Sequence, residues 1–557
     1  MAWAFGVFVL IGLAQIAVGT YVLSSVAKDL KHSFTDDPKH IESNLDGYAS
    51  RLAWANGVMA GPLVWAIEQV PVLGSYVQAS HIAAGASARV SSELNSAVQA
   101  VGVQRLSKPQ TWNAHTWRVV TGRAATALTD VGQALAELKL LPATRALPAN
   151  FRAALQQAQD SGDLLIQTQR YLVAARAILG APGKHTWFLA NQNLAEARGT
   201  GGLIGSFAIL QVNDGRVSLQ RAGSDVDLDK VGTLLPSSGD FHPDAIWGMV
   251  NVKDWRDVNA SANPSYAARQ IASTWQAHTG QTIDGVIFIG QGITKLLVAA
   301  TGQQVVQGVT INSGNVEMYL ARDVYGQFPD PAKKNLFVKT FMHGLFARLV
   351  GGHLDLAAPG AAAAHPTTGD KLWVWLANRR ARVSLAGAGL LGVLNQSAPK
   401  VTLVSLNNAG GNKLDAYIHL DSRLTVCRGS GEARLAVKLS NSAPTAGLPA
   451  YTSPRLDLQP GESRPVGSNR NLVSVYLPKR AELTGFFVDG QEQSAGDYVD
   501  SGREVLVFDL DTNPGAAHRI DVSFTRVRYA KPLDPAILQS SAQFNLPVNR
   551  VNFSPCG

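Results

Sequence analysis

The spacing of apolar residues changes twice along this chain of 557 residues, and that change limits the folds open to it. Over residues 28–182 apolar residues recur every three or four positions, which predicts a helical region. Over 183–400 strand-like and helix-like stretches alternate, which predicts an α/β sandwich. Over 401–557 short alternating stretches separated by turn residues predict an immunoglobulin-like β-sandwich. We therefore expect a multidomain protein.

The first 27 residues form a separate segment without any charged side chain. The run from Trp3 to Val26 is long enough to cross a bilayer, and Trp3 and Tyr21 lie near its ends, as interfacial anchors do. We expect an uncleaved transmembrane anchor over residues 1–27; a cleaved signal peptide and a buried core helix are the alternatives. Two lysines follow the run, so the positive-inside rule alone would place the rest of the chain in the cytoplasm.

The helical region contains clear helical spacing in Ser91–Val101 and Phe151–Leu179. Prolines divide the region, and abundant alanine favours close helix packing. We expect a plain helical stalk or bundle. A partner-binding coiled coil is the alternative, although no sustained heptad repeat supports it.

Strands and helices are expected to alternate in the α/β region. The expected strands are Thr186–Ala190, Gly205–Val212, Val217–Gln220 and Gly285–Ile289. The expected helices are Ser265–His278, Asn315–Leu320 and Lys333–Leu349. The tripeptide Asn213-Asp214-Gly215 predicts a hairpin turn between the second and third strands.

The C-terminal region is expected to be built from strands alone. They are Ala433–Ser440, Leu472–Leu477, Glu482–Val488, Glu504–Asp509 and Arg519–Arg528. The two cysteines of the chain, Cys427 and Cys556, also lie here. A single bridge in an oxidising compartment and two separate thiols are both open.

The composition limits the functional classes and the partners that fit this chain. Charged residues make up 16% of the chain, below the usual ~25%, which fits an envelope protein better than a soluble cytoplasmic enzyme. The formal net charge of +8 favours anionic partners such as phospholipid headgroups, nucleic acid or phosphate-bearing glycans. Because no dense basic run contains interleaved aromatic residues, no nucleic-acid partner is expected. The motifs of serine hydrolases, P-loop proteins, zinc proteases and EF-hands are absent.

The glycine-rich segment Asn191–Ser206 is a candidate binding site. Gly201 and Gly202 permit close approach of a ligand to the backbone, where exposed N–H groups would bind an anionic oxygen. Arg198 suits phosphate because its guanidinium donates two parallel hydrogen bonds. The alternative is a tight structural turn in which Glu196 and Arg198 form an ion pair.

The acidic segment Ser224–Asp229 is a second candidate, with Asp225, Asp227 and Asp229 at alternate positions. In an extended segment the three carboxylates would point the same way. Asp225 and Asp227 are then candidate ligands of Mg²⁺, the one cofactor that the sequence suggests. The alternative is a solvated loop of acids.

The run NQNLAEARGTGGLIGSFAILQVNDGRVSL resembles the signature of the actinobacterial domain-of-unknown-function family 4012, although Gly199 stands where that family usually has Pro. Asp284–Ile287 and Asn441–Pro444 also resemble it. The resemblance covers most of the chain. It implies a membrane anchor, a helical region and a C-terminal β-domain in an outward-facing envelope protein. It therefore favours a plasma-membrane protein with the bulk of the chain extracytoplasmic.

The α/β region is also distantly similar to LytR–CpsA–Psr phosphotransferases, which attach polyprenyl-linked glycans to the cell wall with arginines, aspartates and Mg²⁺. This similarity implies phosphate-binding roles for Arg322 and Lys333 and a metal-binding role for Asp225. The arginine that precedes the equivalent aspartate in those enzymes is Ser224 here, and other arginines are also replaced. Loss of phosphate clamps removes transition-state stabilisation, so the similarity favours binding over transfer.

Three functional hypotheses follow. The first is a single-pass envelope protein that binds a lipid-linked or anionic glycan without catalysis. Its candidate binding residues are Arg198, Gly201, Gly202, Arg322 and Lys333, gathered at one pocket. The second is an Mg-dependent polyprenyl-phosphate glycan transferase or pyrophosphatase. The third is a structural subunit of an envelope protein complex.

Overall fold

The computed structural model of the chain forms two compact units. They are Met1–Gly183 with Asp214–Arg216, and Lys184–Asn213 with Val217–Gly557. The predicted boundary after residue 400 falls inside the second unit, so the α/β and β regions pack together. The structure describes residues 41–60, 64, 73–102, 111–140, 162–235, 253–351, 372–394, 399–427, 430–493, 498–527, 529, 537–541, 545 and 547–554.

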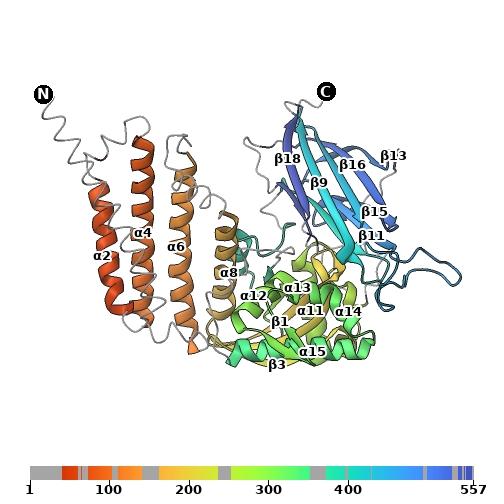
Figure 1. Cartoon of the computed structure of the whole chain (residues 1–557), viewed down its shortest axis with the longest axis horizontal. Helices are drawn as coiled ribbons and strands as arrows, with labels where there is room; N and C mark the ends of the chain where they lie inside the picture. Colours follow the sequence, from red (N-terminus) through yellow and green to blue (C-terminus); the bar gives the residue numbers. More distant parts are fainter. Residues whose placement is uncertain are drawn as a thin grey trace. The chain divides into compact units, whose positions relative to one another are not determined.

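The described part of the first unit is helical, as predicted. Its helices are α2 (Ile41–Met59), α4 (Leu73–Val101), α6 (Ala114–Leu140) and α8 (Gly162–Leu179). Helices adjacent in sequence pack side by side, α2 on α4, α4 on α6 and α6 on α8 (Figure 1). Many of their buried side chains are alanines, which permit close approach of the helix axes; examples are Ala55, Ala79, Ala84, Ala97 and Ala134.

None of the helices in the described ranges is long and apolar enough to cross a membrane. The predicted anchor over residues 1–27 lies outside the described residues.

A mixed sheet forms the centre of the α/β half of the second unit. It has the order β3-β2-β1-β4-β7 and consists of β1 (Lys184–Arg198), β2 (Gly201–Asn213), β3 (Arg216–Ser224), β4 (Gly285–Ile289) and β7 (Leu372–Leu376) (Figure 1). β1 pairs antiparallel with β2 and parallel with β4. Asp214 and Gly215 adopt φ angles of 46° and 83°, as the predicted hairpin turn requires. The predicted strands are confirmed.

The helices of this half agree with prediction at Ser265–His278 and Lys333–Leu349, and the helix predicted at Asn315–Leu320 begins a helical stretch that continues to Gln327. The described elements are α9 (Asp225–Asp229), η3 (Trp255–Asp257), α11 (Pro264–Thr279), α12 (Gln291–Thr301), α13 (Val316–Met318), η4 (Tyr319–Asp323), α14 (Val324–Gln327), α15 (Pro331–Gly351) and α17 (Arg382–Gly387), with a small hairpin of β5 (Gln304–Val306) and β6 (Val309–Ile311).

Helices cover both faces of the sheet because successive side chains of a strand point to opposite sides. Phe188 and Ala190 of β1 join the hydrophobic cluster that contains the buried face of α11. Asn191, the next residue, accepts a hydrogen bond from Thr294 of α12 (3.1 Å) and contacts Met342 of α15. This second, more polar face is the one that builds the candidate site.

The C-terminal half consists of two sheets. One has the order β13-β12-β16-β10-β9-β18, and the other has the order β14-β15-β11-β8-β17. The first contains β9 (Ile418–Cys427), β10 (Ala433–Asn441), β12 (Glu482–Val488), β13 (Gln491–Glu492), β16 (Ala517–Thr525) and β18 (Val548–Ser554). The second contains β8 (Thr402–Asn408), β11 (Asn469–Tyr476), β14 (Tyr498–Asp500), β15 (Arg503–Thr512) and β17 (Leu538–Ser540); the turn η5 (Asp415–Tyr417) precedes β9.

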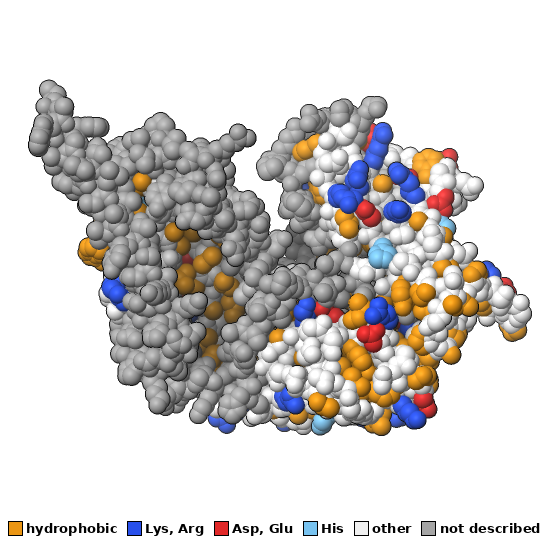
Figure 2. Space-filling view, viewed as in Figure 1, with side chains coloured by type: hydrophobic (Ala, Val, Ile, Leu, Met, Phe, Trp, Pro, Cys, Tyr) orange, Lys and Arg blue, Asp and Glu red, His pale blue; other side chains and the backbone are white. Residues whose placement is uncertain are grey.

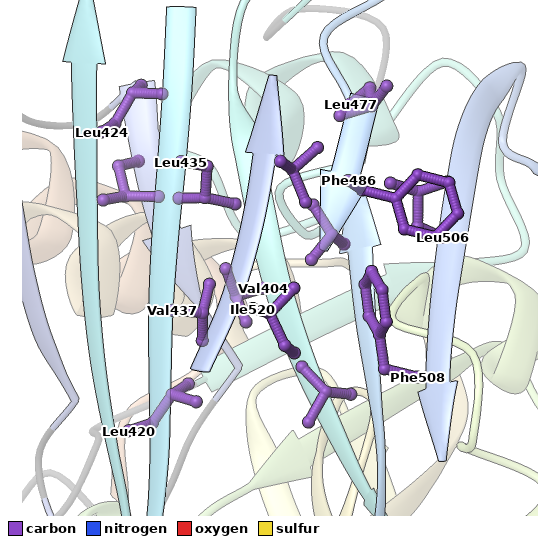
Figure 3. Packing of buried hydrophobic residues seen from close by; sticks show 14 of the residues in the cluster. Val404, Leu420, Leu424, Leu435, Val437, Leu477, Phe486, Leu506, Phe508 and Ile520 are labelled. Carbon is purple, nitrogen blue, oxygen red and sulfur yellow. The ribbon is translucent and has the colours of Figure 1, made fainter. Parts of the chain in front are cut away.

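A shared hydrophobic core joins the two sheets (Figure 3). Leu435, Val437 and Leu439 of β10 point into it, which confirms the predicted alternation. They meet Val404 and Leu506 from the other sheet in the same cluster. Burial of alternate positions therefore explains why this stretch of sequence forms a sandwich.

Cys427, at the end of β9, is disulfide-bonded. Cys556, the other cysteine of the chain, lies outside the described residues.

Val437→Ala tests the importance of the sandwich core. Val437 is fully buried, so the substitution removes apolar burial and leaves a cavity. We expect the free energy of unfolding, measured by urea titration, to fall by about 2–3 kcal/mol. Val499→Ala is the matched control, because the same side chain is 62% exposed on β14, and we expect little change. Equal effects of the two substitutions would contradict the assignment of the core.

Candidate functional site

A pocket of about 320 Å³ lies where the sheet meets the sandwich. Its volume is near the lower end of the ~300–1,000 Å³ typical of small-molecule sites. The α/β half provides most of the wall, and loops of the sandwich provide Gly411, Lys413, Tyr451 and Leu456. The other principal lining residues are Asn191, Gln192, Asn193, Glu196, Leu203, Ser206, Asp225, Val226, Arg256, Gln291, Leu320, Tyr325, Lys334, Asn335 and Val338.

Two of the three basic residues of the wall are neutralised by carboxylates. Arg256 lies 3.4 Å from Asp225, 2.6 Å from Asp229 and 3.0 Å from Asp254. Lys413 forms an ion pair with Glu196. These cations therefore carry little uncompensated charge into the pocket.

The third basic residue, Lys334, forms no ion pair with any carboxylate in the described ranges. Its ammonium lies 5.8 Å from the ring centre of Tyr325 and 5.7 Å from that of Tyr451, within the range of a cation–π interaction. Burial lowers the pKa of Lys334, and the Asp225 carboxylate opposes that effect. A partly desolvated ammonium without a counter-ion is the feature of this wall that an anionic ligand would stabilise.

Amide side chains form another part of the wall. Gln291 donates to Asn193 Oδ1 (3.1 Å), and Asn193 donates to the hydroxyl of Tyr325 (3.0 Å). Asn191 donates to the hydroxyl of Ser206 (3.1 Å). Burial raises the pKa of Tyr325, so its phenol stays protonated. Such a wall carries groups that can both donate to and accept from hydroxyl groups.

Arg198, at the end of β1, does not line the pocket, and its side chain is buried. Its guanidinium pairs with Glu196 (2.9 Å) and Asp257 (3.1 Å) and donates to the carbonyl oxygens of Arg256 (3.0 Å) and Ala197 (2.9 Å). The ion pair with Glu196 is the one expected in the structural alternative for this segment. These contacts place Arg198 behind the pocket wall.

Glu196 connects the sheet to the sandwich through its ion pair with Lys413, and it also pairs with Arg198 on its own strand. Burial by itself raises the pKa of Glu196, but the two cations outweigh burial and lower it to about 2. Glu196 is thus ionised at neutral pH, and its charge is stabilising.

The glycine-rich loop after β1 is buried, so its predicted exposure is wrong. The N–H of Gly199 already donates to Asn407 Oδ1 on β8 (2.9 Å). A Cβ atom on Gly202 would lie 2.1 Å from the carbonyl oxygen of Asn193, and Gly201 has a φ of 153°. These glycines are required by close packing of the backbone, and none of them lines the pocket.

The acidic segment is a short helix, α9, so the predicted common direction of its carboxylates is wrong. Asp225 and Asp229 contact Arg256, whereas Asp227 accepts a hydrogen bond from the N–H of Ser224 (3.1 Å) at the start of the helix. Asp225 lines the pocket, and Asp227 does not. In the ranges that the structure describes, no group of three or more His, Cys, Asp or Glu side chains is arranged to hold a metal ion.

Arg322 and Lys333 lie apart from this pocket. Arg322 pairs with its neighbour Asp323 (2.8 Å) and lines a separate depression of about 270 Å³, which shares Tyr325 and Lys413 with the pocket. Lys333 is exposed in the first turn of α15 and lines neither space. Of the individual phosphate-binding and metal-binding residues proposed from sequence, only Asp225 reaches the pocket wall. The candidate segment Asn191–Ser206 does contribute to the wall, but through residues such as Asn191, Asn193 and Ser206.

Sequence reasoning missed Lys334, Lys413 and Tyr451. For Lys334 a signal existed, because it lies three and seven positions before Phe337 and Phe341, two buried residues of α15, and so shares their side of the helix. Lys413 and Tyr451 come from loops of the sandwich, and no local pattern relates them to the sheet.

Residues 182–325 match a family described as "Protein of unknown function (DUF4012)". The chain contains a DUF4012 domain. This domain includes the amide wall, Asp225 and Arg256, whereas Lys334, Lys413 and Tyr451 lie beyond its end. The resemblance to this family is confirmed for these residues, and the match gives no support to similarity with LytR–CpsA–Psr proteins or to an actinobacterial source. No curated protein and no solved structure matches the chain.

Glu196→Gln in the DUF4012 domain tests the buried ion pairs. Because the pKa of Glu196 is lowered from 4.5 to about 2, its stabilisation is present above pH 4.5 and is lost as the pH falls toward 2. We expect the variant to lose about 3 kcal/mol of unfolding free energy at pH 7, and less with falling pH in that window. Urea titrations at several pH values measure this.

The exposed Glu492 provides the control, since Glu492→Gln removes the same charge from a two-residue edge strand. A loss for Glu196→Gln that is constant from pH 7 to pH 3 would show that the ion pairs do not stabilise the fold.

Proposed function

We propose that this protein binds an anionic group of an envelope glycan, such as a sugar phosphate or a sugar carboxylate, in the pocket between the sheet and the sandwich, and does so without catalysis. Lys334 carries the proposal. It is the one basic residue of the described wall whose charge no carboxylate neutralises. A phosphate or carboxylate oxygen at this position would supply the missing counter-charge.

The rest of the wall supports a ligand that also carries hydroxyl groups. Asn191, Asn193 and Gln291 present amides, and Tyr325 and Tyr451 present aromatic rings. Amides bond hydroxyl groups in both directions, and aromatic rings pack against the C–H faces of a sugar. An ammonium, several amides and two rings around one cavity are the combination that an acidic sugar requires.

Two features support an envelope location: the uncharged residues 1–27 and the disulfide bond of Cys427. The uncharged run over residues 1–27 supports a single-pass membrane anchor, with the bulk of the chain outside the plasma membrane. Disulfide-bonded Cys427 supports an oxidising compartment. A lipid-linked glycan would be accessible to a protein tethered in this way.

The transferase alternative gives Asp225 a metal-binding role, as the similarity to LytR–CpsA–Psr enzymes implies. Asp225 lies 3.4 Å from the guanidinium of Arg256, so a cation would compete with that ion pair. This favours binding over Mg-dependent transfer. The hypothesis of a structural subunit predicts stable co-purification with an envelope protein and stays a prediction.

Lys334→Gln tests the proposed function. We expect the full chain, purified in neutral detergent, to bind glucose 1-phosphate and glucuronate but not glucose, as measured by isothermal titration calorimetry. Loss of a charge-assisted hydrogen bond of about 1.5–3 kcal/mol predicts at least tenfold weaker binding in the variant. Lys334→Arg should retain part of the affinity because it preserves the charge.

Lys333→Gln is the matched control, because it removes the neighbouring lysine, which lies outside the pocket. Equal binding by the wild type and Lys334→Gln would refute the proposal, as would a loss confined to Lys333→Gln. Release of inorganic phosphate from glucose 1-phosphate or a polyprenyl pyrophosphate in the presence of Mg²⁺, abolished by Asp225→Ala, would replace binding with catalysis.

A further inference from the structure

An open groove of about 730 Å³ crosses the outer face of the sandwich sheet that contains β9, β10, β12, β16 and β18. Its lining includes Arg423, Arg434, Ala436, Phe487, Arg519 and Asp521. Lys and Arg side chains gather over this sheet in the space-filling view (Figure 2). The groove is separate from the pocket described above, with which it shares no residue.

Strand pairing places the groove residues, together with flanking residues such as Arg550 and Lys438, in rows across the sheet. The central row runs Phe487, Asp521, Ala436, Arg423, Arg550, from β12 to β18. Ala436 forms the low centre of this row because its side chain is short. At about 4.8 Å per strand, the row extends over about 19 Å, the length of several sugar units.

The two neighbouring rows add further cations. One contains Arg519, Lys438 and Asp421, and the other contains Arg434 and Thr425. The three rows together bring five basic residues to one face, which also carries Asp421 and Asp521. One of the five, Arg434, pairs with Glu432 (3.1 Å).

Like charges lie next to each other in two of these rows. Arg519 is directly opposite Lys438, and Arg423 is directly opposite Arg550. Like charges in adjacent positions of a sheet repel one another and destabilise it. A sequence selected for stability alone would avoid both pairs, so the arrangement points to an anion that lies across them.

The two aspartates compensate only the ends of this surface. Asp521 pairs with Arg519 (2.7 Å), and Asp421 pairs with Arg550 (2.9 Å). Arg423 and Lys438 form no ion pair within the described part of the chain. They are two strand positions apart diagonally across β9 and β10 and border Ala436. The charge of Arg423 in the groove and that of Lys438 beside it are therefore available to a ligand.

Phe487 adds an apolar surface at one end of the central row. Its side chain is 39% exposed, although the preceding residue, Phe486, is buried in the sandwich core. Its direct cross-strand neighbours are Asp521 and Glu492, and Arg519 lines the groove with it. An exposed ring can pack against the C–H face of a sugar while cations elsewhere in the groove bind its acidic groups.

We propose that this groove binds an acidic polysaccharide whose carboxylate or phosphate groups contact Arg423 in the groove and Lys438 beside it and whose sugar ring packs on Phe487. The concave, elongated form fits a chain better than a flat lipid surface. One aromatic residue is too few for the successive base stacking by which proteins hold single-stranded nucleic acid.

The test measures binding of the full chain in neutral detergent to polygalacturonate, with neutral dextran as the reference polymer. We expect binding to polygalacturonate alone, and weaker binding at higher salt. Arg423→Gln with Lys438→Gln should weaken it about fivefold to tenfold. Lys400→Gln with Arg480→Gln removes the same charge from exposed positions outside the groove and should leave binding unchanged. Near-identical thermal unfolding of the variants establishes that the fold is retained.

Two further variants test the contact of the sugar ring with Phe487 and the independence of the groove from the pocket. Phe487→Ala should weaken binding of polygalacturonate but not of inorganic polyphosphate, which has no sugar ring. Lys334→Gln should leave polymer binding intact, so failure of the pocket proposal and failure of the groove proposal are distinguishable. Unchanged binding in the Arg423/Lys438 double variant would overturn the proposal. Tighter binding to a thymidine oligonucleotide or to phosphatidylglycerol vesicles, lost in the same variant, would also overturn the choice of polysaccharide.

Discussion

The second unit depends on a set of buried charges at the end of β1. Arg198 pairs with Glu196 and Asp257, and Glu196 also pairs with Lys413 from the sandwich. A buried charge is costly unless an opposite charge and hydrogen bonds compensate it, so each member needs the others in place. Separating the sheet from the sandwich would break the Glu196–Lys413 pair and leave Arg198 with two carboxylates. This constraint gives a physical reason why residues 184–557 form one compact unit rather than two.

The same ion pairs determine which charge of the pocket is open to a ligand. Glu196 neutralises Lys413, and three aspartates neutralise Arg256. Lys334 is the basic residue of the described wall that forms no ion pair and instead lies over two aromatic rings. Ion pairs also determine which cations on the outer face of the sandwich are open to a ligand. There, carboxylates compensate Arg519, Arg550 and Arg434, whereas Arg423 forms no ion pair within the described residues. In both places we expect the ligand to bind at the unpaired cation, because a cation that is paired with a carboxylate attracts a further anion only weakly.

The type and order of the secondary-structure elements could largely be predicted from the sequence, whereas most of the residues that line the pocket could not. The strand β10 could be predicted because every second residue, including Leu435, is buried on one face. Such burial produces an alternating pattern of apolar residues in the sequence. The side-chain chemistry of Arg198 and Lys333 predicts phosphate binding, yet Arg198 is saturated by buried partners and Lys333 is exposed to solvent outside the pocket. The alternate acids predict that Asp225 is a metal ligand in an extended segment, but it lies on a helix beside Arg256. Each difference arises from contacts that no local pattern encodes.

The order of helical, mixed and β regions was determined by the sequence itself, because the period of apolar residues is a property of a few consecutive positions. The glycines after β1 were visible as well, although their reason, close backbone packing, was not. Only the tertiary structure decided which cations are neutralised and which face a cavity. That outcome depends on pairs such as Glu196 and Lys413, which are 217 positions apart, and electrostatic compensation acts through space rather than along the chain.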